Sequence, residues 1–109
     1  MDLDPKHAGV FNNWGVLLGH QGQLVEAMAK FRKAVALAPN YVNANNNLGK
    51  ILIRLNRQVE AVELAENALG AGIKLGDLGS WPCEALQKVE VKLMPEAYHR
   101  NQAAQLGCR

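Results

Sequence analysis

A repeat of 34 residues constrains the fold of this chain more than any other feature of its sequence. Eight residues of 8–41 recur at that interval in 42–75, and they are spread over both halves of the unit. They are Asn12, Asn13, Gly15, Leu18, Val25, Glu26, Ala27 and Ala34. Repeats of this length are typical of stacked supersecondary units, each of which buries its apolar face against its neighbours. The chain is therefore predicted to contain tandem copies of one unit.

Each unit carries the apolar spacing of two amphipathic helices. In the first unit, Phe11, Trp14, Leu17 and Leu18 recur at spacings of three and four, as expected for one buried helical face. Gly22 interrupts this pattern, and a second apolar stripe then runs over 24–35. The second unit repeats both stripes, so the sequence predicts an all-α fold.

Small residues recur where the two helices of a unit would cross. Gly15 and Gly49 occupy the same place in the two units, and alanines follow in the second helices: Ala27, Ala34, Ala61 and Ala68. Helices approach to about 8–10 Å where the side chains at their contact are small. Because glycine within a helix costs about 1 kcal/mol relative to alanine, its repetition predicts close contact with a neighbouring backbone. The alternative is that these glycines end helices.

This pattern resembles the tetratricopeptide repeat, a 34-residue helix–turn–helix unit. The first unit matches its characteristic large, small, aromatic and proline positions with Phe11, Trp14, Gly15, Ala27, Phe31, Ala34 and Pro39. The second unit keeps Leu48, Gly49, Ala61 and Ala68. It departs at Asn45, at Ala65 in place of the aromatic residue, and at Ile73 in place of proline. The resemblance implies a right-handed superhelical stack of such units, with about six helices.

We expect a single domain over 1–109, with repeats at 8–41 and 42–75. The segment 78–109 is predicted to be a degenerate third repeat or, alternatively, capping helices, because a stack must end in a more polar outer face. Leu3–Pro5 is similar to the tail of a preceding repeat, which suggests either a longer array or a gene that begins inside one.

The third segment fits the repeat pattern if two residues are inserted in the turn cluster at 76–80. Its apolar stripe is then expected to dock on the second unit: Trp81, Ala85, Leu86, Val89 and Leu93. Pro95 is expected to begin a last helix, where its missing N–H is tolerated.

Composition is that of a globular chain, with 49% hydrophobic and 20% charged residues and a formal net charge of +2. No run of about 18 apolar residues is present, so no membrane span is expected. No secretory leader is visible at the N-terminus, and we predict a cytoplasmic location. The slight net charge does not favour a nucleic-acid partner.

The sequence offers no pattern for catalysis, a metal or a cofactor. Its three histidines lie far apart, and no phosphate-binding glycine motif is present. Cys83 and Cys108 match no zinc spacing and are not expected to form a disulfide framework. Cys108 lies beside the chain end, where a preorganised nucleophile is not expected. We therefore predict that the chain is not an enzyme and uses no cofactor or metal.

The resemblance also implies a binding surface, because the first helix of each repeat lines a concave groove in this family. Carried over to this chain, the predicted partner-binding residues are Asn12, Asn13, Val16, His20, Asn43, Asn46, Asn47, Lys50 and Arg54. A primary amide offers two donors and an acceptor, so a ladder of asparagines can bind an extended peptide backbone. Lys50, Arg54 and His20 would favour an acidic segment or a C-terminal carboxylate. The alternative is that the asparagines cap helices or face water.

One family site is not expected here. The carboxylate clamp that binds chaperone tails requires lysine and asparagine at positions five and nine of the first unit. This chain has Asn12 and Val16 there.

The resulting hypothesis is a non-catalytic protein-interaction module that binds a peptide or partner helix in this groove. A second hypothesis is a self-associating scaffold fragment, in which an apolar flank near Val10 and Leu17 is covered by another copy. A third, RNA binding by helical repeats, draws on a pI near 8.7.

Overall fold

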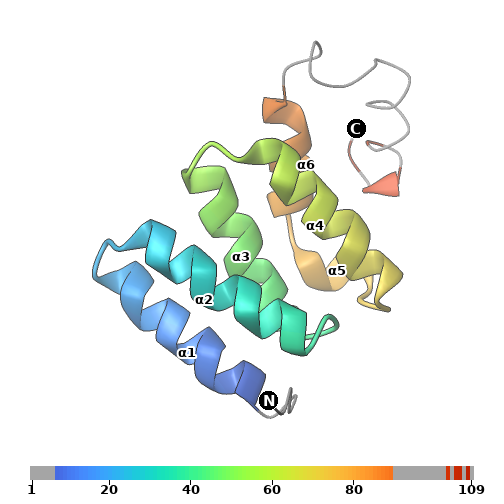
Figure 1. Ribbon diagram of the computed structural model, residues 1–109. Coiled ribbons are helices and arrows are strands. Elements are labelled where there is room, and N and C mark those ends of the chain that lie inside the picture. Colours follow the sequence, from blue (N-terminus) through green and yellow to red (C-terminus); the bar gives the residue numbers. More distant parts are fainter. Residues whose placement is uncertain (1–6, 90–102, 104, 107, 109) are drawn as a thin grey trace.

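The computed structural model describes residues 7–89 together with 103, 105, 106 and 108. The described residues form helices and turns and contain no strand, so the prediction of an all-α fold is confirmed (Figure 1). The helices are α1 (His7–His20), α2 (Leu24–Leu37), α3 (Val42–Arg54), α4 (Gln58–Gly70), α5 (Leu75–Leu78) and α6 (Trp81–Lys88). The six helices agree with the expected number.

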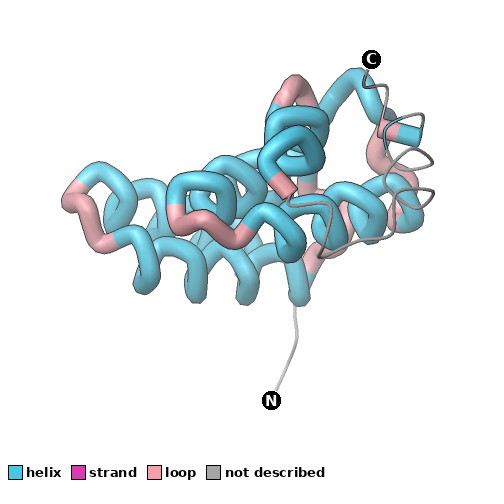
Figure 2. The backbone as a smooth tube through the Cα atoms, turned by 90° about the horizontal axis from the view of Figure 1, so that it is seen from above, coloured by secondary structure: helices cyan, strands magenta, loops and turns pink. Residues whose placement is uncertain are grey.

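The first four helices form two consecutive hairpins. Figure 1 shows α1, α2 and α3 following one another across the molecule, with α4 and α6 at the far end. Figure 2 shows the same helices from above, with short loops joining each to the next. α6 packs against both α3 and α4 and so covers the end of the second hairpin.

The turns within the two hairpins share one backbone geometry. Gly22 has a φ of 79°, and Asn56, at the same place in the second unit, has a φ of 60°. Glycine adopts this left-handed conformation freely, and asparagine tolerates it better than most residues. In the first turn the N–H of Gln23 donates to the carbonyl of Leu18 at 2.9 Å, and the counterpart bond in the second turn measures 2.7 Å. Each first helix therefore ends in the same capped turn.

The main core lies where α2, α3, α4 and α6 meet. Among its largest fully buried apolar side chains are Leu52, Val62, Leu78 and Leu86. The alanines expected at the helix crossings, Ala27, Ala34, Ala61 and Ala68, are buried as well.

The departure of the second unit at Asn45 has a structural reason. Its side chain is 1% exposed, and its amide nitrogen donates to the backbone carbonyls of Pro39 at 3.0 Å and Tyr41 at 2.8 Å. Asn45 therefore ties the loop between the hairpins to α3, where a large apolar residue was expected.

The two helix glycines are buried beneath aromatic rings. A Cβ atom at Gly15 would lie 2.5 Å from the ring of Phe31, and one at Gly49 would lie 2.4 Å from the indole of Trp81. The sequence predicted close contact with a backbone, but the close neighbour is an aromatic side chain in both cases. The second unit has Ala65 where the first has Phe31, and Trp81 of α6 supplies the ring that covers Gly49.

The stripe predicted in the third segment is buried over its described part, at Trp81, Ala85, Leu86 and Val89. Leu93 and Pro95 lie outside the described residues. The four-residue α5 lies in the predicted turn cluster, and the eight-residue α6 follows it as the first of the two helices expected there. The second was expected to begin at Pro95, outside the described residues.

The two cysteines are joined, which corrects the expectation that they form no framework. Cys83 of α6 and Cys108 form a disulfide with a Cα–Cα distance of 5.4 Å, and Leu106 beside it is 3% exposed. The bond closes a loop across 25 positions of sequence. Local spacing carries no signal for it, because the fold brings the two residues together.

The three basic residues of α2 have two different roles. Arg32 pairs with Glu60 of α4. The ammonium of Lys30 lies 3.9 Å from the ring centre of Trp14, and that of Lys33 lies 5.9 Å from the ring centre of Phe11. Cation–π contacts thus link α2 to α1.

Candidate partner-binding groove

A pocket of about 220 Å³ lies between α1 and α3. It is lined by Val16, Gly19, His20, Phe31, Asn47, Lys50, Ile51 and Arg54. Five of the predicted groove residues are thereby brought together: Val16, His20, Asn47, Lys50 and Arg54. They meet because α1 and α3 are the corresponding helices of two adjacent units, so residues at similar repeat positions lie on one side of the stack.

This pocket combines apolar walls with one sign of charge. Val16, Phe31 and Ile51 contribute apolar surface, while Lys50 and Arg54 contribute positive charge. No acidic side chain lines the pocket among the described residues. The pocket therefore suits an anionic group that is attached to an apolar one.

The amides of the first two units are partly engaged with each other. Asn47 donates its side-chain N–H to the carbonyl oxygen of Asn12 at 3.0 Å, and Asn12 itself is buried. Asn12 therefore orients Asn47 and leaves the carbonyl oxygen of Asn47 as an acceptor. The side chain of Asn13 is exposed, makes no hydrogen bond within the described part of the chain, and does not line the pocket.

A second pocket, of about 480 Å³, continues from the first toward the C-terminal helices. Its lining residues are Asn46, Lys50, Gly76, Asp77, Leu78, Gly79, Ser80, Trp81 and Glu84. Lys50 lines both pockets, so the two are adjacent, and we call them together the groove.

Asn46 holds the second half of the groove in place. The indole N–H of Trp81 donates to its side-chain oxygen at 2.7 Å, and its own amide donates to the carbonyl of Asp77 at 3.0 Å. Both ends of this amide are thus used within the chain. Of the predicted groove residues, Asn43 is exposed on α3 and lines neither pocket.

The sequence did not identify Asp77, Ser80, Trp81 and Glu84 as groove residues. The only sequence feature that pointed to this segment was the proposed two-residue insertion at 76–80, which shifts the third segment relative to the repeat. That shift brings the turn before α6 toward Asn46 and Lys50.

Within the described residues, no helix is both long and apolar enough to cross a bilayer. No group of three or more histidine, cysteine, aspartate or glutamate side chains there is placed to hold a metal ion.

Comparison with known families agrees with this architecture. The model of the TPR repeat matches residues 20–56, from the end of α1 to the turn after α3. The match and the paired helices show that this stretch resembles a tetratricopeptide repeat. Such repeats are in general non-catalytic protein-interaction modules.

A curated relative carries the same stretch within a longer chain. Protein O-mannosyl-transferase TMTC3 of Homo sapiens is 29% identical over 100 residues, which is 91% of this chain. The chain spans 11% of the length of that relative.

Proposed function

We propose that the groove binds an extended segment of a partner protein and that the chain does this without catalysis. The observation that carries the proposal is the position of Lys50, which lines both pockets at the centre of the surface. The match of residues 20–56 to the TPR repeat supports an interaction role in general, and the groove supplies a specific surface for it.

The charges of the groove support a direction for the bound segment. The α1–α3 pocket is basic through Lys50 and Arg54, whereas the second pocket includes Asp77 and Glu84. We propose that an acidic side chain or a C-terminal carboxylate lies against Arg54, and that a basic residue lies toward α6. Complementary charges of this kind set orientation and association rate more than total affinity.

The polar contacts would come from Asn47 and Asn13, as the ladder hypothesis requires. The side-chain oxygen of Asn47 stays available as an acceptor after its amide donates to Asn12. Asn13 is exposed on α1. Asn46 would act indirectly, because its amide holds Trp81 and Asp77.

The first prediction tests the groove by charge reversal. A partner is first identified by affinity capture with the wild-type chain. Replacing both Lys50 and Arg54 with glutamate is then expected to weaken the binding of this partner by at least about tenfold. The matched control is Lys74→Glu, because Lys74 is exposed and lines neither pocket. Isothermal titration calorimetry at two salt concentrations measures the difference.

The pair Asn13→Ala and Asn47→Ala examines the amide contacts separately. We expect a loss of about threefold to tenfold for each single replacement, because one net hydrogen bond contributes about 1 kcal/mol. Unchanged affinity in both sets of variants, with the circular dichroism and melting temperature of the wild type, would show that the partner binds elsewhere.

Self-association is the second candidate, and the exposed side of α1 favours it. Trp14 is 47% and Leu17 is 56% exposed, whereas their counterparts in the second unit, Leu48 and Ile51, are 4% and 6% exposed. In the second unit α2 packs on α3, and the counterparts of Trp14 and Leu17 are buried. We propose that a second copy of the chain covers the corresponding side of α1.

The second prediction concerns this surface. Light scattering of the chain over micromolar to millimolar concentrations is expected to show a dimer that Leu17→Glu disrupts, because a charge would be buried in the interface. Ala36→Glu, at an exposed position of α2, is the matched control. A monomer at every concentration would exclude this role.

The predicted cytoplasmic location stays a prediction. The disulfide between Cys83 and Cys108 supports a different proposal, in which the chain folds in an oxidising compartment. Disulfides persist in such compartments and are rare in the cytosol, where thiols are kept reduced.

A further inference from the structure

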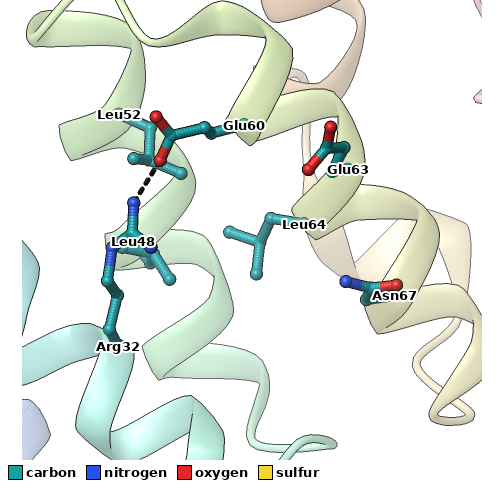
Figure 3. A pocket seen from close by; sticks show the side chains of 7 residues that line it. All are labelled: Arg32, Leu48, Leu52, Glu60, Glu63, Leu64 and Asn67. Carbon is teal, nitrogen blue, oxygen red and sulfur yellow. Dashed lines mark hydrogen bonds and ion pairs between the residues drawn. The ribbon is translucent and has the colours of Figure 1, made fainter.

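A cavity of about 180 Å³ lies between α2 and α4, and we call it the α2–α4 cavity (Figure 3). It is lined by Arg32, Leu48, Leu52, Glu60, Glu63, Leu64 and Asn67. Consecutive helical residues are rotated by about 100°, so Leu48 and Leu52 project from α3 roughly opposite to Asn46 and Lys50. The cavity is therefore separate from the groove.

The inner part of the α2–α4 cavity is apolar. Leu48, Leu52 and Leu64 line it, and each is less than a tenth exposed. Figure 3 shows Leu64 extending from α4 toward α2, with Arg32 across the gap. Preformed apolar recesses of this kind accept a single buried side chain, which is how a few anchor residues dominate many interfaces.

The outer part of the cavity carries one carboxylate without an ion-pair partner. Arg32 is paired with Glu60, which also accepts a hydrogen bond from Arg57 at 3.2 Å. Glu63 is exposed and has no ion-pair partner within the described part of the chain. Glu63 is thus the carboxylate beside the leucine floor that is open to a cation from a partner.

We propose that the α2–α4 cavity binds a partner segment in which a leucine- or methionine-sized side chain is followed by lysine or arginine. The apolar side chain occupies the space above Leu48, Leu52 and Leu64, and the cation pairs with Glu63. The amide of Asn67, one helical turn after Glu63, is positioned to hydrogen-bond the backbone of the segment. An acidic residue in the second place is rejected, because like charges would meet at Glu63.

The experiment uses three capped dipeptides that differ in one side chain: acetyl-leucyl-lysine amide, acetyl-leucyl-glutamine amide and acetyl-leucyl-glutamate amide. Each is titrated into the full chain while the methyl NMR signals of Leu48, Leu52 and Leu64 are recorded. We expect saturable shifts with the lysine peptide and binding about threefold to tenfold weaker with the glutamine peptide, as removal of one exposed charge pair predicts. The glutamate peptide is expected to be weakest.

Two variants localise the effect. Glu63→Gln is expected to make the lysine and glutamine peptides bind alike, whereas Glu26→Gln, at an exposed position of α2 outside the cavity, leaves the preference unchanged. Both replacements are at the surface, so the fold is retained. Absence of shifts at these three leucines, or equal binding of the three peptides by the wild-type chain, overturns the proposal, and neither result bears on the groove.

Discussion

Replacing Trp81 with alanine is expected to lower the free energy of unfolding by about 3–5 kcal/mol, the range observed for removing a buried aromatic side chain. Trp81 is 2% exposed, covers Gly49, and donates its indole N–H to Asn46 at 2.7 Å. Its loss therefore removes a large part of the contact between α6 and α3. Chemical denaturation followed by circular dichroism measures the effect.

The same contact predicts that Gly49→Ala changes the stability in opposite directions with and without Trp81. In the wild-type chain, Gly49→Ala is expected to destabilise by about 1–3 kcal/mol, because its Cβ would lie 2.4 Å from the indole ring. In the Trp81→Ala background the ring is absent, so the same replacement should stabilise by up to about 1 kcal/mol through helix propensity. A double-mutant cycle measures this coupling.

Trp81→Phe provides the control for the hydrogen bond. Phenylalanine keeps an aromatic ring over Gly49 but cannot donate to Asn46, so a loss of about 1–2 kcal/mol is expected. Equal stability of Trp81→Ala and the wild type would contradict the packing described for α6.

Reduction of the disulfide is expected to produce the second large effect. Closing a loop of 25 residues removes conformational freedom from the unfolded chain, and the chain-entropy estimate is about 3 kcal/mol. For a domain of this size, that loss lowers the melting temperature by roughly 10 °C or more. Differential scanning calorimetry with and without a reductant gives the shift.

The double variant Cys83→Ala and Cys108→Ala is the matched control, because a reductant should leave its melting temperature unchanged. Peptide mapping after alkylation reports whether the bond is present in chain isolated from cells. Free thiols in that material, together with a melting temperature that does not respond to reductant, would contradict both the stabilisation and the proposed oxidising compartment.

The helical hairpins were predictable because their information is local and repeated. Apolar residues such as Phe11, Trp14 and Leu18 recur at helical spacing, and the same spacing returns 34 residues later. A period of three to four residues defines a helix face but does not show whether that face is covered. The prediction that Trp14 and Leu17 are buried was wrong, because they are 47% and 56% exposed.

Contacts between segments were harder to predict, since they depend on the fold that joins them. Asn45 was a departure from the repeat in the sequence, and only the path of the preceding loop gives its amide two carbonyl partners. Likewise, nothing near Cys83 in the sequence indicates Cys108 as its partner.

The candidate groove was predictable in its first half alone. Val16, His20, Asn47, Lys50 and Arg54 follow from their positions in the repeat, and the structure brings them to one pocket. The second half depends on the irregular segment before α6, whose register does not follow the repeat. The role of Asn46 differs for the same reason, since its partners come from that segment.

The ring of Trp81 over Gly49 also limits how this chain can be re-engineered. The second hairpin lacks an aromatic residue of its own at Ala65 and takes one from the following helix. The first hairpin, with Phe31, has no such requirement. The two units are therefore not interchangeable parts: reversing their order, or grafting 42–75 into another protein, would leave a hole beside Gly49 unless a new aromatic residue were designed to fill it.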